Sequence, residues 1–329
     1  MAGRKSVTVG TARSKPGAWA TGTLRLGDYP DGPITTPINI LSGAEPGPVL
    51  WVQAAIHGAE IVGAVAMLRL FQKIDTARMK GHIVGIMATN ATAFRAQKRL
   101  TPYDGENLNR LFPGMPAGPH SRQTADVLFR TATGVADAMM DIHSGGLEAV
   151  VPFYGLYYDD GSAASNEARR LAESVGSEVV WASRDAWLDG AMYVNFTRAG
   201  KPGVIVECGG GGWLMEEHVA NVTGAIEGVA KAMGILPGRP PRRKSYTVVQ
   251  DCDLVFNTAG GFFMPTVEVG AIVAKGAVIG RVMNAHGQIV EEVRCPKGPA
   301  YLAALGKPYA PIHSGAMVAE CIGVVSTAE

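Results

Sequence analysis

Residues 48–60 read PVLWVQAAIHGAE, an apolar run that ends in a histidine and a glutamate. The apolar part, residues 48–56, predicts a buried strand, and residues 60–74 then carry apolar side chains at helical spacing. In open α/β sheets, functional groups lie where a strand ends and a helix begins. His57 and Glu60 stand at that junction, and their spacing lets both side chains reach one metal ion from one face of a helical turn.

The chain up to about residue 235 alternates between strand-like and helix-like segments. Turn signals rich in glycine, proline and aspartate separate the first strands. This alternation predicts an α/β fold with a doubly wound, mainly parallel sheet. We expect strands at residues 23–26, 34–41, 49–56, 81–88, 138–143, 178–182 and 203–207, and helices at residues 60–74, 121–133 and 165–175.

The composition changes at residues 234–245, which hold three prolines and four basic residues, as is typical of a linker. So short a basic run is interpreted as a solvated hinge and not as a nucleic-acid surface. Beyond it, helical periodicity disappears and glycines separate short β-like segments at residues 254–256, 271–273, 278–282 and 317–319. We therefore expect an α/β domain that carries the candidate site at residues 1–238, and a small all-β domain at residues 239–329.

The bulk composition describes a packed globular protein, with 47% hydrophobic and 18% charged residues. A net charge of +1 offers no electrostatic argument for binding nucleic acid or a membrane surface. No segment reaches the roughly 18 continuous apolar residues that span a bilayer, and no apolar core follows the basic N-terminal residues, so no secretory signal is expected. The four cysteines lack CxxC spacing, which favours buried thiols in a cytoplasmic protein.

A second histidine ends another expected strand. His143 would complete a three-ligand site with His57 and Glu60, and the fourth position of a zinc ion would stay open for water. Asp141 lies two residues before His143, so both side chains point to the same face of a strand. Asp141 either holds the His143 imidazole in one tautomer or pairs with an arginine.

Glu207 follows three aliphatic residues at the end of a late strand, so its carboxylate is expected to be partly buried. A buried, unpaired carboxylate is costly and needs a compensating role. Activation of a water at the metal supplies one, and a salt bridge to Arg99 or Arg198 is the alternative. The adjacent Cys208 is expected to be a buried structural thiol, because no histidine is evident as its partner.

Three motifs occur in order along the chain, each at a strand end or in a loop beside one. They are HxxE at residues 57–60, NRLFPG at residues 109–114 and DIHSGG at residues 141–146. Together they resemble the succinylglutamate desuccinylase/aspartoacylase family, whose relatives are the zinc carboxypeptidases. The resemblance covers about residues 20–235, and the sequence of residues 104–110 is closest to bacterial deacetylases of N-acetylated diaminobutyrate.

The resemblance implies a zinc-carboxypeptidase type of sheet and one Zn²⁺ per chain. It also implies a function: removal of an acyl group from an N-acylated amino acid or a related small carboxylate, by attack of water on the amide. The implied site consists of the zinc ligands His57, Glu60 and His143, the general base Glu207, the carboxylate-binding pair Asn109 and Arg110, and Arg99 as the group that polarises the carbonyl, with Arg95 as its competitor.

Two other functions stay open at this point. A metallocarboxypeptidase would use the same metal and base on a peptide C-terminus, and it would need an open groove. A metal-free binding protein on the same scaffold would lack bound zinc, although all the chemical positions are intact. The small β domain either roofs the cleft or forms an interface between copies of the chain.

Overall fold

The structure is a computed structural model that describes residues 6–328. The basic N-terminal residues 1–5, on which the expectation about a secretory signal rests, lie outside this range. Its strands are β1 Thr8–Val9, β2 Ala12–Arg13, β3 Trp19–Tyr29, β4 Gly32–Ser42, β5 Glu45–Ala54, β6 Lys80–Ile86, β7 Ala138–His143, β8 Ala149–Tyr158, β9 Val179–Ser183, β10 Gly203–Gly210, β11 Tyr246–Phe256, β12 Gly261–Pro265, β13 Ile272–Val273, β14 Val278–Met283, β15 Ile289–Arg294, β16 Ala300–Gly306, β17 Pro311–Ile312 and β18 Met317–Ala328. Its helices are α1 Val62–Lys73, α2 Ala91–Ala96, α3 His120–Val135, α4 Ala163–Glu173, α5 Met192–Arg198 and α6 Glu216–Ala232, with short 3₁₀ turns η1 Thr76–Arg78, η2 Leu108–Arg110 and η3 Ala186–Leu188.

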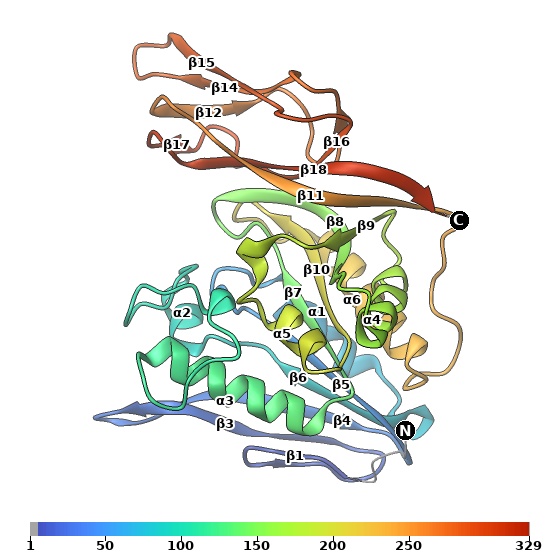
Figure 1. Cartoon of the computed structure of the whole chain (residues 1–329). Helices are drawn as coiled ribbons and strands as arrows, with labels where there is room; N and C mark the ends of the chain where they lie inside the picture. The colour runs from blue at the N-terminus through green and yellow to red at the C-terminus, as the bar shows by residue number, and fades with distance from the viewer. Residues whose placement is uncertain (1–5, 329) are drawn as a thin grey trace.

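One central sheet of twelve strands runs through the molecule in the order β13-β16-β18-β11-β9-β8-β10-β7-β5-β6-β4-β3 (Figure 1). Strands β6, β5, β7 and β10 are parallel and form its middle. The prediction of a mainly parallel sheet is wrong, because the sheet is mixed. Strands β8, β9 and β11 also pair in parallel with one another, but β8 runs antiparallel to β10, and the outer strands at both ends of the sheet pair antiparallel. The short connections explain the antiparallel pairs. Residues 144–148 join β7 to β8 and are too few for a helical crossover, so β8 runs antiparallel to β10, the parallel neighbour of β7. A tight hairpin likewise joins β3 to β4.

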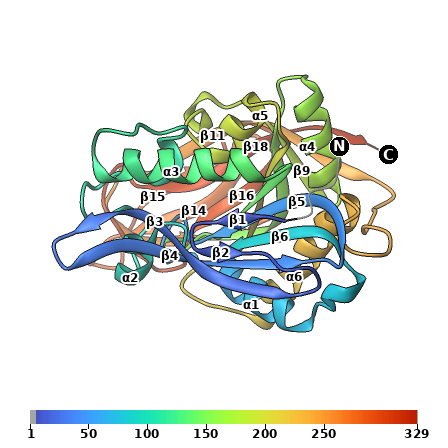
Figure 2. The same cartoon turned by 90° about the horizontal axis from the view of Figure 1, so that it is seen from below.

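Helices cover both faces of the sheet. Figure 2 shows α3 and α5 on one side of the strands and α1 and α6 on the other. Alternate residues of β5 enter the two cores: Trp51 packs in the core that includes α3 and α5, and Leu50 packs in the core that includes α1, α4 and α6. The doubly wound arrangement is therefore present, and the three expected helices appear as α1, α3 and α4 within a few residues of their predicted bounds.

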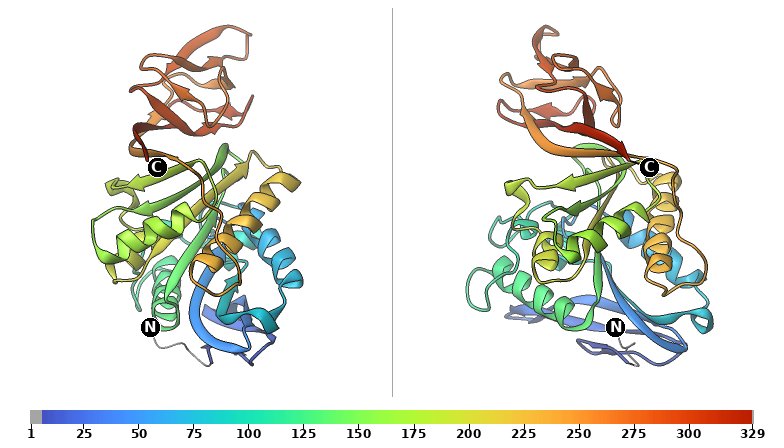
Figure 3. Two further views of the ribbon diagram at one scale, coloured as in Figure 1. Left: turned by 90° about the vertical axis from the view of Figure 1, so that its right-hand side faces the viewer. Right: turned by 45° about the vertical axis from the view of Figure 1, so that its right-hand side comes forward.

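The C-terminal part continues the central sheet. Residues 233–245 join α6 to β11, and β11 pairs in parallel with β9. Strands from both sides of the predicted linker therefore belong to one sheet. Strands β15, β14, β12 and β17 form a separate four-stranded sheet, which lies at the end of the molecule far from the N-terminal strands (Figure 3). The division into two domains at residue 238 stays a prediction. Within the described range, no helix has the length and apolar character needed to cross a membrane.

Candidate metal and catalytic site

The loop that follows β5 positions His57 and Glu60. The backbone turns at Ala55, whose φ of 54° lies in the left-handed region that is costly for a residue with a side chain. At Gly58 the loop packs so tightly on α2 that a Cβ atom would lie 2.0 Å from the carbonyl carbon of Ala93. Strain and close packing together hold the segment before α1 in one shape, and both candidate ligands are buried there.

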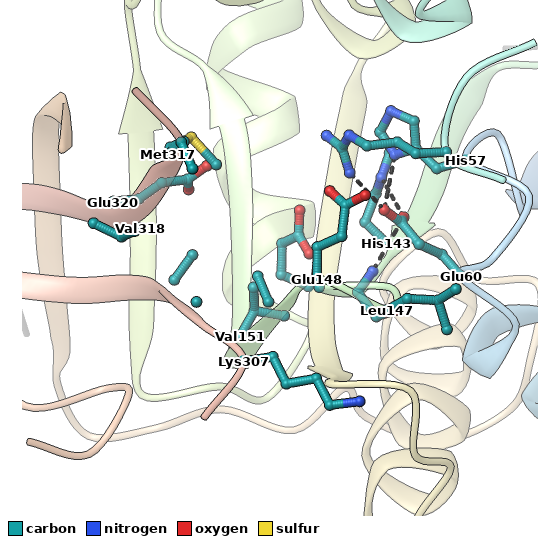
Figure 4. Close-up of a pocket in the computed structure, with 18 of the residues that line it drawn as sticks. His57, Glu60, His143, Leu147, Glu148, Val151, Lys307, Met317, Val318 and Glu320 are labelled. Atoms are coloured by element: carbon teal, nitrogen blue, oxygen red, sulfur yellow. Dashed lines mark hydrogen bonds and ion pairs between the residues drawn. The ribbon is translucent and has the colours of Figure 1, made fainter. Parts of the chain in front are cut away.

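The structure brings His143 to the same point. His143 is the last residue of β7, the parallel neighbour of β5, so the carboxyl ends of the two strands meet. One candidate ligand atom from each of His57, Glu60 and His143 lies within 4.8 Å of the others. Figure 4 shows the three side chains converging at one end of a pocket.

The hydrogen-bonding pattern distinguishes the two nitrogens of each imidazole. Nδ1 of His57 lies 2.9 Å from Oε1 of Glu60, and Nδ1 of His143 lies 3.0 Å from Oε2 of Glu60. The outer nitrogens face other groups: Nε2 of His57 is 3.1 Å from Oδ1 of Asn107, within hydrogen-bond distance, and Nε2 of His143 is 3.2 Å from Oδ2 of Asp141, an ion-pair distance without hydrogen-bond geometry. An outer-shell oxygen such as that of Asn107 fixes the tautomer of a ligand histidine. Two Nδ1 atoms and one carboxylate, all buried, are a donor set that fits Zn²⁺.

The electrostatics of the cluster keep the carboxylate ionised. Burial raises the pKa of Glu60, but the neighbouring His57 and His143 outweigh burial and hold this pKa far below its usual range. Burial lowers the pKa of His143, and the carboxylates of Asp141 and Glu60 outweigh it and raise this pKa well above the usual value. Among the described residues, no arginine forms an ion pair with Asp141, so the first of its two expected roles is the one that its position supports.

Glu207 lies beside the cluster on β10, directly opposite His143 in the parallel register. Its Oε2 atom is buried without a hydrogen-bond partner, and the side chain lines the cavity described below. Burial raises the pKa of Glu207 to about 8, and the nearby charge of Glu60 adds to the effect. The alternative salt bridges are not formed, because Arg99 pairs with Glu60 and Arg198 pairs with Asp189.

Of the two candidate arginines, only Arg99 reaches the site. Its Nη1 atom donates a hydrogen bond of 3.0 Å to Oε1 of Glu60, and its side chain lines the cavity. Arg95 lies in the last turn of α2, is exposed and does not line the cavity. The position of Arg99 supports its assignment over Arg95.

Asn109 and Arg110 also line the cavity, in the short turn η2. Oδ1 of Asn109 accepts a 3.1 Å hydrogen bond from the backbone of Met192, and its Nδ2 lies 3.3 Å from Nε2 of His143. The Arg110 guanidinium donates to the Asn109 carbonyl oxygen at 2.8 Å and lies over the Trp187 ring, 4.9 Å from its centre. Asn109 therefore links the backbone of Met192 to the His143 side chain, while the guanidinium of Arg110 is held at the cavity wall by stacking on Trp187.

The cavity measures about 540 Å³, and two distant parts of the chain build it. Residues from β5 to β10 supply the cluster and the arginines. Residues 304–320 line the opposite wall and include Lys307, His313, Val318 and Glu320. The C-terminal region was expected either to roof the cleft or to form an interface between copies of the chain. Because it lines the cavity, it takes part in roofing the cleft.

Several lining residues were missed by the sequence analysis. Trp181 and Trp187 both line the cavity, and the Nε1 atom of each is buried with no hydrogen-bond acceptor among residues 6–328. Nothing local in the sequence distinguishes these tryptophans from core residues. Glu320, however, interrupts an apolar run from Ala316 to Gly323, which is the same signal that identified Glu207.

Comparison with known families places this site in context. The family model described as the succinylglutamate desuccinylase/aspartoacylase catalytic domain matches residues 46–233. This range contains the whole candidate metal cluster, both cavity arginines and Glu207.

Individual relatives extend the match over nearly the whole chain. The N-alpha-acetyl-L-2,4-diaminobutyric acid deacetylase of Halomonas elongata is 28% identical over 303 residues, which cover 90% of this chain and 88% of the relative. A product-bound structure of the ectoine utilization protein EutE from Ruegeria pomeroyi has 27% identity and a TM-score of 0.82, with 93% of this chain and 95% of that one covered. A succinylglutamate desuccinylase from Silicibacter, at 24% identity, has the same fold, with a TM-score of 0.83 and coverage of 97% and 100%.

Proposed function

The chain belongs to the succinylglutamate desuccinylase/aspartoacylase family, and on that premise we propose that it is a zinc-dependent amidohydrolase that removes the acyl group from an N-acylated amino acid. One observation carries the proposal. The carboxylate of Glu207, whose Oε2 atom is buried without a partner, stands next to a buried His57–Glu60–His143 cluster at the wall of a cavity of small-molecule size. A carboxylate in such a place is costly unless it takes part in chemistry.

His57, Glu60 and His143 would hold the metal, the histidines through Nδ1. When bound, zinc supplies a Lewis acid that polarises the acyl carbonyl and lowers the pKa of water toward about 7. Glu207 accepts a proton from the attacking water and delivers it to the leaving nitrogen of the amine product. In the metal-free chain burial raises the pKa of Glu207 to about 8, and the positive charge of bound zinc would oppose this rise, so that the carboxylate could accept the proton of the water.

The two arginines divide the remaining tasks. Arg99, which lies against Glu60, is placed to stabilise the negative charge that develops on the carbonyl oxygen. Arg110 faces the cavity with a planar fork of donors that suits a carboxylate. The substrate is thus an amide that carries a carboxylate, as every N-acyl amino acid does.

The comparison relatives support this reaction class and suggest the acyl group. The Halomonas relative is named as a deacetylase of an acetylated diamino acid, which makes acetyl the first candidate. Four free cysteines agree with a reducing compartment, and we place the enzyme in the cytoplasm. A carboxypeptidase is disfavoured because the C-terminal region lines the cavity, and a peptide chain needs an open groove.

The test is a screen of N-acetyl, N-succinyl and N-formyl amino acids with zinc-loaded and chelator-treated protein. We expect hydrolysis of at least one series, about one zinc per chain and loss of turnover on chelation. Hydrolysis of C-terminal peptide bonds but of no N-acyl amino acid would overturn the proposal in favour of a carboxypeptidase. Tight ligand binding with no turnover and no zinc would overturn it in favour of a binding protein.

A further inference from the structure

Glu320 is a charged side chain of the cavity to which the proposed reaction gives no task. It lies on β18, between Leu254 of β11 and Ala304 of β16, and it lines the cavity from the C-terminal side. Figure 4 shows Glu320 on one side of the pocket and His57, Glu60 and His143 on the other. Its carboxylate forms no hydrogen bond or ion pair with any residue in the described range.

The groups around Glu320 leave its carboxylate unpaired at the cavity wall. Burial raises the pKa of Glu320, although the positive charges of Arg99 and Arg110 oppose the rise. Neither arginine lies within ion-pair distance of it, because Arg99 pairs with Glu60 and Arg110 stacks on Trp187. Glu320 is partly exposed, and it faces the cavity. A positive group that enters the cavity beside it would therefore gain an unpaired carboxylate as its partner.

The other carboxylates that line the cavity have different positions. Glu60 belongs to the metal cluster, Glu207 stands against it, and Glu148 lies in an exposed loop at the cavity wall. Glu320 alone among them comes from the C-terminal wall, opposite the cluster. The cavity therefore offers three distinct places: a metal cluster for the acyl carbonyl, Arg110 for a carboxylate, and an anionic group for a cation.

We propose that Glu320 binds a free ammonium group of the substrate and so selects N-acylated diamino monocarboxylates over N-acylated dicarboxylates. The inference rests on the proposed function for the placement of the acyl group and the carboxylate. A second carboxylate at the end of the side chain would meet Glu320 across a desolvated space and be repelled. A methyl group at the same place would leave the Glu320 charge unpaired.

The test uses three substrates whose side chains have two methylene groups and then an ammonium, a methyl or a carboxylate: N-α-acetyl-2,4-diaminobutyrate, N-acetylnorvaline and N-acetylglutamate. We expect the zinc-loaded protein to prefer the ammonium substrate in kcat/KM over the methyl substrate by about 10- to 100-fold, the usual range for one unpaired buried polar group. Glu320→Gln should remove this preference, leave the methyl substrate within about threefold and improve the carboxylate substrate.

Glu268→Gln is the matched control, since it removes the same charge from an exposed side chain of the C-terminal region that does not line the cavity. It should keep the wild-type order of the three substrates. Glu320→Asp keeps the charge on a shorter side chain and should keep part of the preference, which covers the case in which Glu320→Gln folds poorly. A preference that survives Glu320→Gln would overturn the proposal, because another group would then select the ammonium. An equal loss on all three substrates would also overturn it, because Glu320 would then act on the site in general and not on the end of the side chain.

Calorimetric binding of 2,4-diaminobutyrate and norvaline separates this inference from the proposed reaction, because neither probe needs turnover. We expect tighter binding of the diamino acid to wild-type protein and equal binding to Glu320→Gln. If no N-acyl substrate turns over but this difference is found, the proposed reaction is wrong and the assignment of Glu320 stands. If turnover is found and both probes bind alike to the wild type, the assignment of Glu320 is wrong and the reaction stands.

Discussion

Replacement of Glu207 by glutamine should abolish activity and at the same time make the metal-free protein more stable. Burial raises the pKa of Glu207 from 4.5 to about 8, so the folded chain holds a proton there that the unfolded chain releases. The resulting penalty on folding is absent below pH 4.5, grows as the pH rises and is complete above pH 8. At pH 7 it amounts to at most about 3 kcal/mol, from 1.36 kcal/mol per pH unit.

Glutamine has nearly the same shape and no charge, so Glu207→Gln should recover most of this penalty. The unfolding entropy of a chain of 329 residues is roughly 0.7 kcal/mol per kelvin, which converts about 3 kcal/mol into an increase of about 4 °C in Tm. Calorimetric melting of chelator-treated protein at pH 5 and pH 8 checks the size and the sign. The increase should be small at pH 5 and larger at pH 8, and bound zinc should reduce it by stabilising the carboxylate of the wild type.

The same variant should retain zinc and lose kcat by about 10²- to 10⁴-fold, the usual contribution of a general base. Two results would refute the reasoning. An unchanged or lower Tm at pH 8 would mean that the carboxylate is solvated or paired in the folded protein. A loss of kcat below tenfold would mean that another group activates the water.

Three further changes test the rest of the site. His57→Ala and His143→Ala should each lose both bound zinc, measured by elemental analysis, and activity, because a three-ligand site cannot spare one ligand; full zinc content in both variants would contradict the metal assignment. Arg110→Ala should lower kcat/KM on the acid substrate by about 5- to 150-fold, corresponding to 1–3 kcal/mol, and add little on its carboxamide analogue; penalties that simply add would argue against a carboxylate clamp. Arg99→Ala should lower kcat by about 10²- to 10³-fold, while the kcat of Arg95→Ala should stay near wild type. Equal effects of the two substitutions would contradict the role of Arg99 in stabilising the charge on the carbonyl oxygen.

The parts of the fold that were predicted correctly are those with strong local signals. Strand β7 was predicted with its observed bounds because residues 138–143 lead continuously into a histidine that ends the strand. The clustering of His57, Glu60 and His143 followed from the same rule, since each lies at or just after the carboxyl end of a parallel strand; their role as metal ligands stays a prediction. Glu207 was identified because a carboxylate directly after an aliphatic run needs a reason to be there.

The parts that were missed depend on packing between distant segments. Helix α6 was not predicted, in part because Gly224 and Gly228 lower its helix propensity, yet at Gly228 a Cβ would lie 2.0 Å from the carbonyl oxygen of Ser174. Strand β8 contains Pro152 and Gly155, which weaken a strand signal. The direction of β8, and hence the mixed character of the sheet, follows from the length of a loop and not from the residues of the strand.

The place of β18 in the sheet has a consequence for how the chain is made. A ribosome delivers β11 and β16 before it delivers β18, which then has to enter between them. A nascent or truncated chain that ends before Met317 leaves the facing edges of β11 and β16 bare, and bare strand edges promote aggregation. The same late strand carries Glu320 into the pocket. A chain that ends before Met317 therefore lacks both the strand that pairs with β11 and β16 and the residues of β18 that line the cavity.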